Sequence, residues 1–261
     1  MSIDRRAFLI AAAAAGVAAC SSSAKRASSA STASTSSTST SPTASTATAA
    51  SAAPTGPARF VATGPTGRQR IALTFHTAGT AAHFDALTAI LDARHIVITA
   101  FIVGSWLDAN LDRGRRLVAS GHELANHTYN HLTFASLPPA QMASEITRCR
   151  DAIAKVAPDG GALFRPSGTD DGTAVPPAAV LAAAWDAGYP TVLGFDADPQ
   201  DYTDPGATAV RDRTIAALHD GAIVSLHFDH QGTIDALPAI LDAVHARGLT
   251  PVTASTLLRG S

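Results

Sequence analysis

The sequence predicts an α/β domain, a distorted or incomplete (β/α)7 barrel in which parallel strands alternate with helices. Short apolar runs rich in β-forming residues alternate with longer segments of helical apolar spacing. The strand runs are nearly continuously apolar, which is typical of parallel strands covered by helices. Seven such runs favour a barrel over a doubly wound sheet. The sequence has no Gly-x-Gly-x-x-Gly turn, which argues against a nucleotide site.

The elements follow one another in strict alternation. The predicted strands are 71–75, 96–101, 122–126, 162–165, 191–195, 222–227 and 249–252. The predicted helices are 81–94, 106–120, 139–156, 177–187, 207–220 and 233–247. Several of these helices are followed by a glycine, the residue that most readily adopts a left-handed C-terminal cap. We assign the folded domain to residues 58–261, a size that one hydrophobic core can serve.

Residues 1–20 predict an export signal with a lipobox. Arg5 and Arg6 precede an apolar run that is too short to span a membrane. The order Arg-Arg-x-Phe-Leu resembles a twin-arginine signal, and Val-Ala-Ala before Cys20 resembles the bacterial lipobox. We therefore expect Cys20 to be lipidated and to anchor the protein to the outer face of the bacterial cell membrane. The alternative is a plain secretory signal with a chance cysteine.

Residues 21–57 consist almost entirely of Ser, Thr, Ala and Pro, and predict a disordered tether. The formal net charge of -2 argues against a nucleic-acid partner, because binding to phosphates requires a basic excess. The second cysteine, Cys149, has no remaining partner and is expected to be a buried free thiol. Nothing in the sequence indicates an oligomer, so we expect a monomer.

Polar residues collect where predicted strands end. They are His76, His127, Arg165, the stretch from Asp196 to Asp201, and His227. In α/β barrels the carboxyl ends of the strands and their loops converge and carry the active site. The sequence therefore predicts that these side chains line one pocket.

A pair of histidines gives the strongest local pattern. His127 and His131 lie four residues apart, a spacing that on one helical turn would place both rings on the same side. Two such imidazoles are suited to share a metal ion. Zinc is the first choice for imidazole ligands, with cobalt, nickel and manganese as alternatives.

Two further residues end apolar strands. The strand-end position of His227 favours a proton donor over a hydrogen-bonded core histidine. Arg165 would need a carboxylate partner if buried, and Asp196, Asp198 or Asp201 is expected to supply one.

This set of residues, in this order, resembles the polysaccharide deacetylases of carbohydrate esterase family four, over about residues 71–257. The second to fifth family motifs are matched by His127-Thr128 with His131, by Arg165-Pro166-Ser167-Gly168, by Asp198 with Asp201-Tyr202, and by Leu226-His227. The first motif departs. The family has Thr-Phe-Asp-Asp-Gly, whereas this chain has Thr74-Phe75-His76-Thr77-Ala78.

The departure changes the expected site. In the family, the first aspartate of that motif is the general base and the second is a metal ligand, and His76 and Thr77 stand in their places. Three arrangements are open. His76 joins His127 and His131 as a metal ligand, a carboxylate from the 169–171 loop or from Asp229 takes the vacant place, or the metal is lost and the cleft only binds sugar. We favour the first arrangement.

The resemblance implies a metal-dependent hydrolase that removes N-acetyl groups from cell-wall polysaccharide or oligosaccharide. His76 would be the base when it is not a ligand, and Arg165 would orient it. His227, oriented by Asp201, would protonate the departing amine. The main alternative is a non-catalytic carbohydrate-binding lipoprotein that keeps the fold. A further alternative is a hydrolase that acts on another amide or imide bond.

Overall fold

The computed structural model describes residues 56–259. The predicted signal, Cys20 and all but the last two residues of the predicted tether lie outside the described residues. Between residues 56 and 259, no helix has both the length and the apolar character that a membrane span requires.

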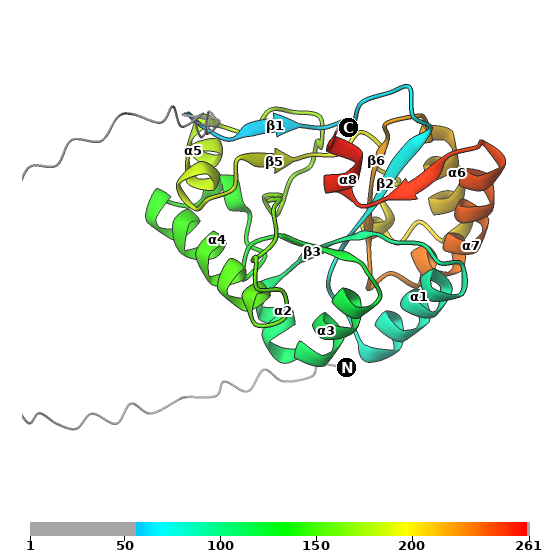
Figure 1. Cartoon of the computed structure of the whole chain (residues 1–261), viewed down its shortest axis with the longest axis horizontal. Coiled ribbons are helices and arrows are strands. Elements are labelled where there is room, and N and C mark those ends of the chain that lie inside the picture. The colour runs from blue at the N-terminus through cyan, green and yellow to red at the C-terminus, as the bar shows by residue number, and fades with distance from the viewer. Residues whose placement is uncertain (1–55, 260–261) are drawn as a thin grey trace, which may run out of the picture. The chain divides into compact units, whose positions relative to one another are not determined.

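Strands and helices alternate along most of the chain (Figure 1). The strands are β1 (Arg59–Val61), β2 (Arg70–His76), β3 (Thr99–Ile102), β4 (Glu123–Asn126), β5 (Thr191–Leu193), β6 (Ile223–His227) and β7 (Thr250–Val252). The α-helices are α1 (Ala81–Ala93), α2 (Gly104–Ala109), α3 (Leu111–Ala119), α4 (Pro139–Ala154), α5 (Ala178–Asp186), α6 (Ala207–Ala217), α7 (Gln231–Ala246) and α8 (Ala254–Leu258). Two short 3-10 helices are η1 (Phe134–Ser136) and η2 (Asp201–Thr203).

All strand pairs are parallel, which confirms the predicted α/β class. One sheet has the order β4-β3-β2-β6, with β7 also paired to β2, and β1 pairs with β5 in a separate ladder. Single-residue bridges span the two gaps: Phe164 bonds to Asn126 and Val192, and Ala197 bonds to Val224. The strands therefore form a distorted, incompletely closed barrel, as predicted.

The boundaries differ from prediction in a few places. The strand expected at 162–165 is reduced to the bridge at Phe164, because Gly161 (φ 78°) and Pro166 interrupt the extended run on either side. The helix expected at 106–120 divides at Asn110, whose φ of -138° and ψ of 42° are not helical. Strand β1 and helix α8 were missed, since runs of three and five residues are too short to establish a period.

The alternation of side chains along β2 separates two hydrophobic clusters. Ile71, Leu73 and Phe75 pack outward among the helices. Ala72 points to the other side of the strand, into the interior of the barrel. His76 has the same parity as Ala72 and therefore lies on the inner side, at the carboxyl end of the strand.

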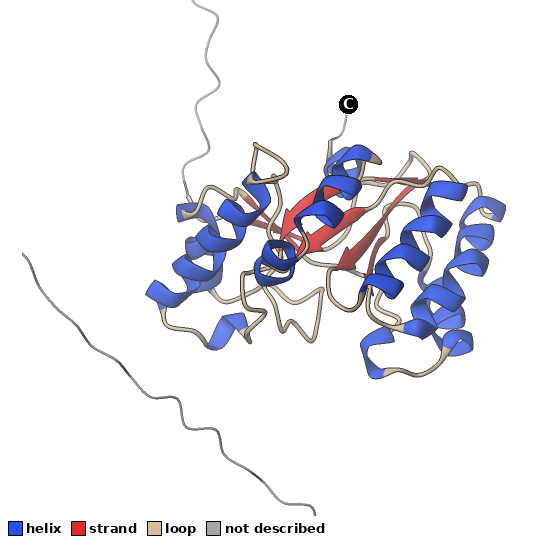
Figure 2. Cartoon of the chain, turned by 90° about the horizontal axis from the view of Figure 1, so that it is seen from below, coloured by secondary structure: helices blue, strands red, loops and turns tan. Residues whose placement is uncertain are grey.

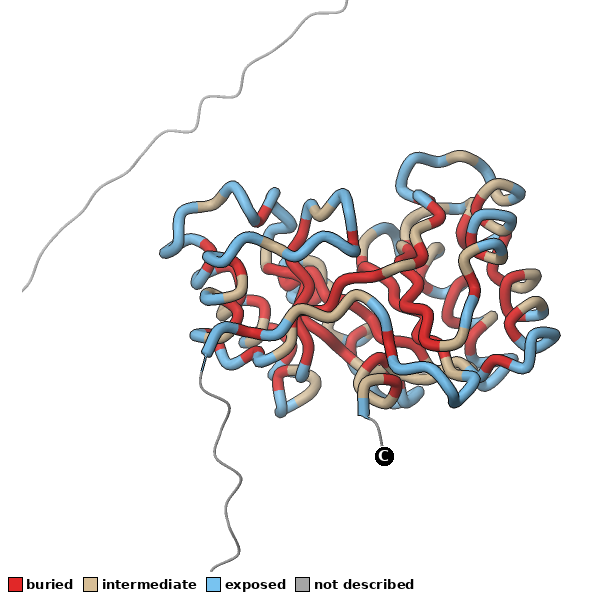
Figure 3. The backbone as a smooth tube through the Cα atoms, turned by 90° about the horizontal axis from the view of Figure 1, so that it is seen from above, coloured by how far each residue is buried: buried red, intermediate tan, exposed pale blue. Residues whose placement is uncertain are grey.

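The inner cluster fills the barrel below the site. It contains Ala72, Phe101, Ala125, Leu163, Leu193, Phe195 and Ile223 from the strands and their flanks, with Ala254 and Leu257 from α8. In Figure 2 helices lie on both sides of the strands, and in Figure 3 buried residues lie towards the middle of the domain while exposed ones lie towards its outside. The amino ends of the strands are packed with apolar side chains, which leaves the carboxyl ends for the site.

Candidate active site

Strand register brings the histidines together. His76 pairs directly with His227 across β6 and with Phe101 across β3. His127 follows β4 with the same inward parity. The ring of His76 lies 4.0 Å from that of His127 and 4.5 Å from that of His227, measured between centroids. The predicted convergence at the strand ends is therefore present in the structure.

These rings line a cavity of about 250 Å³. Its walls include His76, His127, His131, Arg165 and His227, together with Tyr202 and Asp198. Asp201 lies behind His227 and is completely buried. All the residues predicted for the site thus belong to one place in the fold.

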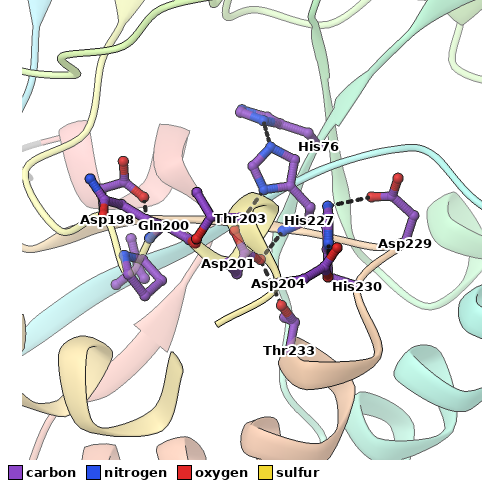
Figure 4. Close-up of polar contacts among 12 residues, drawn as sticks. His76, Asp198, Gln200, Asp201, Thr203, Asp204, His227, Asp229, His230 and Thr233 are labelled. Atoms are coloured by element: carbon purple, nitrogen blue, oxygen red, sulfur yellow. Dashed lines mark hydrogen bonds and ion pairs between the residues drawn. The ribbon is translucent and has the colours of Figure 1, made fainter. Parts of the chain in front are cut away.

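Asp201 fixes the ring of His227 (Figure 4). One carboxylate oxygen accepts from Nδ1 of His227 at 2.8 Å. The other accepts from the backbone N–H of His227 at 2.8 Å and from the hydroxyl of Thr233 at 2.6 Å. Since Nδ1 donates to the carboxylate, Nε2 of His227 is the nitrogen that remains to act on a substrate. Thr233, on α7, was not singled out from the sequence.

Arg165 is 1% exposed and does not have the carboxylate partner that the sequence suggested. Its guanidinium donates to the carbonyl oxygens of Leu193 and Gly194, to the hydroxyl of Thr74 and to Nε2 of His76. All four acceptors are neutral. Burial lowers the pKa of Arg165 to about 9, and the ring of Phe101, 4.0 Å from the guanidinium, offers a cation–π contact.

The three candidate aspartates have other positions. Asp201 is bound to His227, and Asp196 accepts from the backbone N–H of Ile223. Asp198 is half-buried on the cavity wall and favours the charged form of Arg165 only through space. Burial raises the pKa of the Asp198 carboxyl. The guanidinium therefore stays without a directly bonded anion.

The hydrogen bond from Arg165 also determines which ring nitrogen of His76 carries the proton. A guanidinium can only donate, so Nε2 of His76 accepts its bond at 3.0 Å. Nδ1 of His76 must then carry the proton, and it donates to Nε2 of His227 at 2.8 Å. Burial, followed by repulsion from His127, His227 and Arg165, lowers the pKa of His76 well below its usual value. His76 is therefore a neutral imidazole with both nitrogens engaged.

One nitrogen is free to bind a metal ion, and a second histidine ring lies beside it. Nδ1 of His127 donates to the carbonyl oxygen of Arg165 at 2.9 Å, so Nε2 carries a free lone pair. This Nε2 atom is buried and has no hydrogen-bond partner. Burial lowers the pKa of His127 well below its usual value, which keeps the lone pair available. The ring of His131 lies 4.9 Å from that of His127.

A third ligand is not in place. Both nitrogens of His76 are bonded within the protein, and the hydroxyl of Thr77 accepts from the backbone N–H of Val103 at 3.0 Å. Across residues 56–259, no three His, Cys, Asp or Glu side chains are arranged to hold a metal. A catalytic zinc needs three protein ligands. The predicted set of His76, His127 and His131 is therefore not formed, and these residues do not fit such a zinc.

The carboxylates considered as substitutes do not complete the site either. Asp170 lines the cavity wall. Asp171 accepts from the backbone and hydroxyl of Thr173. Asp229 lines a neighbouring cavity. None of them completes a three-ligand group with the two histidines.

The segment after β4 is an irregular loop and not the helical turn expected from the histidine spacing. Thr128 and His131 have φ values of 68° and 55°, which end any helical path. Glu145 holds the loop: it is 2% exposed and accepts from the backbone N–H groups of Tyr129 and Asn130 at 3.0 and 2.7 Å. Glu145 was missed in the sequence, although a lone carboxylate on the apolar face of α4 could have indicated it.

Comparisons with known proteins agree with this fold. Residues 63–192 match the family described as polysaccharide deacetylase. The chain is 30% identical over 203 residues to a chitooligosaccharide deacetylase of Rhizobium leguminosarum, covering 70% of this chain and 85% of the relative. The chain belongs to the polysaccharide deacetylase family, which is a family of hydrolases.

Two further matches are similar to this chain in sequence or in fold. It is 29% identical over 201 residues to a peptidoglycan-N-acetylglucosamine deacetylase of Bacillus cereus, which covers 75% of this chain and 91% of the relative. Among solved structures, a carbohydrate esterase family four pseudoenzyme from Bacillus anthracis matches with a TM-score of 0.69 and 22% identity, covering 78% of this chain and 70% of that one. The last match concerns the fold.

Proposed function

We propose that this chain removes N-acetyl groups from a cell-wall polysaccharide or oligosaccharide. The observation that carries the proposal is the Asp201–His227 pair, whose ring faces the cavity while the buried carboxylate fixes its orientation. The substrate class follows the named activities of the relatives, which are peptidoglycan and chitooligosaccharide deacetylases.

Two histidines of the cavity have separate roles in the proposed reaction, one as proton acceptor and one as proton donor. Nε2 of His127, a neutral nitrogen with a free lone pair, accepts a proton from the water that attacks the acetyl carbonyl carbon. His227, with a proton on both ring nitrogens and its Nδ1–H held by the Asp201 carboxylate, gives the Nε2 proton to the amine nitrogen as the C–N bond breaks. Acetate and a free amine result. His76 does not act as the base, because it has no free lone pair.

The deacetylases of this family are in general metal-dependent. A bound divalent ion would polarise the acetyl carbonyl and acidify an attacking water. His127 and His131 would supply two of the nitrogens such an ion needs, and no third ligand is placed beside them among residues 56–259. The steps above therefore use only side chains of this protein.

A second function has an observation in its favour. With His76 in place of an aspartate, the site lacks the carboxylate that serves as base in the family, and the ring of His76 is hydrogen-bonded to Nε2 of His227. A non-catalytic carbohydrate-binding protein would keep the cavity and lose the chemistry. The family contains a pseudoenzyme, in Bacillus anthracis.

Acetate release separates the two functions. Protein purified without chelator is incubated with chitin oligomers and peptidoglycan fragments, alone and with Zn²⁺, Co²⁺, Ni²⁺ or Mn²⁺. The proposal predicts acetate from at least one substrate and none from the His227→Ala variant. Binding of the same oligomers without acetate under any condition would favour the non-catalytic alternative.

The cellular location is part of the same proposal. Export through the twin-arginine-like signal and a lipid on Cys20 would place the domain beside cell-wall glycan. Labelling of cells with radioactive palmitate tests the anchor. The full chain should incorporate label, and the Cys20→Ala variant should not. Size-exclusion chromatography with light scattering tests the expected monomer.

A further inference from the structure

The cavity of the candidate active site contains a buried hydroxyl that the proposed reaction does not use. Ser225 lies on β6 two residues before His227, and therefore on the same inner side of the strand. At a rise of roughly 3.3 Å per residue, Ser225 lies about 6–7 Å deeper in the barrel than His227. Ser225 is 2% exposed, and the surface that it keeps lies on the wall of the cavity of about 250 Å³.

The hydroxyl of Ser225 has no hydrogen-bond partner among residues 56–259. Every other buried serine or threonine hydroxyl in this range has one. Thr74, which pairs with Ser225 across the sheet, shows the contrast. Its hydroxyl donates to the carbonyl oxygen of Val224 and accepts from Arg165. Because buried polar groups are satisfied in nearly all proteins, the hydroxyl of Ser225 is available to a polar group of a ligand.

The surroundings of Ser225 favour recognition over nucleophilic attack. A serine nucleophile is activated by a general base within hydrogen-bond reach. The nitrogens of His76 are bonded to His227 and Arg165, and Nδ1 of His227 is bonded to Asp201. Neither ring is bonded to Ser225, so this hydroxyl has no base to take its proton.

The direction of the bound substrate decides which of its atoms meet Ser225. A glycan is too large for this cavity and must extend to the outside, with its amide nitrogen at Nε2 of His227. The acyl group then points the other way, into the cavity, towards the walls that Ser225 and Phe195 form. An acetyl group would place its methyl group against the unpartnered hydroxyl and leave that hydroxyl unsatisfied, which is unfavourable.

We propose that the site prefers an N-acyl group that ends in a hydroxyl, with hydroxyacetyl as the smallest example, over N-acetyl. The acyl hydroxyl and the hydroxyl of Ser225 form one hydrogen bond, since each can donate and accept. Water adds to the acyl carbon and the C–N bond breaks, which gives hydroxyacetate and the free amine. This inference rests on the proposed function and names the acyl group that the same site selects.

The charges around the cavity favour a neutral acyl end. Asp170 and Asp198 line the walls and would repel an acyl group that ends in a carboxylate. The guanidinium of Arg165 lines the same cavity, but it donates to four acceptors of the protein. Ser225 is therefore the group that remains to bind the end of the acyl chain.

The experiment compares two tetrasaccharides that differ only in the acyl group. Tetra-N-acetylchitotetraose and the same tetrasaccharide with N-hydroxyacetyl groups are given to the full-length chain, and the free amine formed yields kcat/KM for each. We expect wild type to prefer the hydroxyacetyl substrate by at least about fivefold, the effect of one hydrogen bond. Ser225→Ala should lose this preference or reverse it, because a methyl group then faces a methyl group.

Thr88→Val is the matched control. Thr88 lies on α1, and its hydroxyl is buried outside the cavity, where it donates to the carbonyl oxygen of Phe84. This variant should keep the preference of wild type. A wild-type preference for acetyl, equal kcat/KM for the two substrates, or a preference that Ser225→Ala retains would overturn the inference.

Calorimetry with the same two tetrasaccharides separates this inference from the proposed catalysis. Tighter binding of the hydroxyacetyl form by wild type, lost in Ser225→Ala, would support the acyl preference even if neither substrate is hydrolysed. Equal binding of the two forms by a chain without turnover would overturn it. Binding of neither tetrasaccharide would overturn the inference together with the proposed glycan specificity.

Discussion

Nδ1 of His76 donates a hydrogen bond to Nε2 of His227 across a distance of 2.8 Å. Nε2 of His227, the nitrogen that should act on the substrate, is therefore already hydrogen-bonded to the ring of His76. A proton on Nε2 of His227 would face the N–H of His76. The donation by Arg165 prevents His76 from reversing its bond, because a guanidinium cannot accept. Catalysis at this site therefore requires that the hydrogen bond between His76 and His227 break.

The first prediction concerns His76→Asp. A carboxylate at this position would accept from Arg165 and from a doubly protonated His227, instead of donating to it. It would also pair the buried guanidinium with an anion. We expect acetate release from chitin oligomers to rise at least about tenfold, within the range that general acid–base groups contribute. His76→Asn, which cannot carry the charge, is the control and should show no such rise. A rate for His76→Asp no higher than that of wild type would contradict the bonding scheme.

The second prediction concerns Asp201→Asn. The amide keeps the size of the side chain but cannot accept on both sides, so His227 loses its orientation and its charge partner. We expect acetate release to fall by on the order of a hundredfold or more. Asp204→Asn is the matched control, since Asp204 flanks η2 and its side chain is 75% exposed. Equal losses in both variants would mean that the effect is structural.

The third prediction concerns Thr77→Asp. Family resemblance places a metal-ligating carboxylate at this position, and the cavity wall here includes both Thr77 and His131. The variant should retain about one zinc per chain after dialysis, measured by inductively coupled plasma mass spectrometry, because three ligands would then be available. Wild type should retain substantially less. Stoichiometric zinc in wild type would show that a third ligand forms from another residue.

The fourth prediction is a dependence of stability on pH. Burial lowers the pKa of His76 and of His127 well below 6.5 in the folded protein, whereas the unfolded chain titrates near 6.5. Below that pH the unfolded state binds more protons. The free energy of unfolding should therefore fall as the pH falls below 6.5, with a slope that approaches about 1.4 kcal/mol per pH unit for each of the two histidines well below that pH.

Urea denaturation at pH 6.5 and at about 5.5 measures this slope. His127→Gln removes one of the titrating rings and should reduce the slope. The matched control is His245→Gln, at an exposed position on α7, which should leave it unchanged. A free energy of unfolding that stays constant over this interval would show that the two histidines titrate alike in both states.

The sequence predicts much of this site because strand parity and strand direction are encoded locally. His76 and His227 end apolar parallel strands, and a period of two residues places both on the inner side. Asp201 could be paired with His227 only through the family resemblance. Its carboxylate reaches His227 because η2 starts at this residue, and a helix of three residues leaves no periodic pattern.

The errors arise from contacts between segments far apart in the chain. The role of His76 depends on which of its ring nitrogens is bonded to Arg165. Because Arg165 lies 89 residues further along the chain, no local sequence pattern predicts this contact. The path from His127 to His131 depends on the buried carboxylate of Glu145 on α4. The four-residue spacing of His127 and His131 therefore suggested a metal site on a helical turn. The structure instead has a loop whose backbone N–H groups are bonded to Glu145.

The most direct test is acetate release from tetra-N-acetylchitotetraose by wild type and by His227→Gln, compared at equal occupancy of bound sugar. His219→Gln, at an exposed position before β6, is the control. We predict that wild type and His219→Gln release acetate at similar rates and that His227→Gln is slower by about a hundredfold or more. A His227→Gln rate equal to that of wild type would contradict the assignment of this pocket as the deacetylase site.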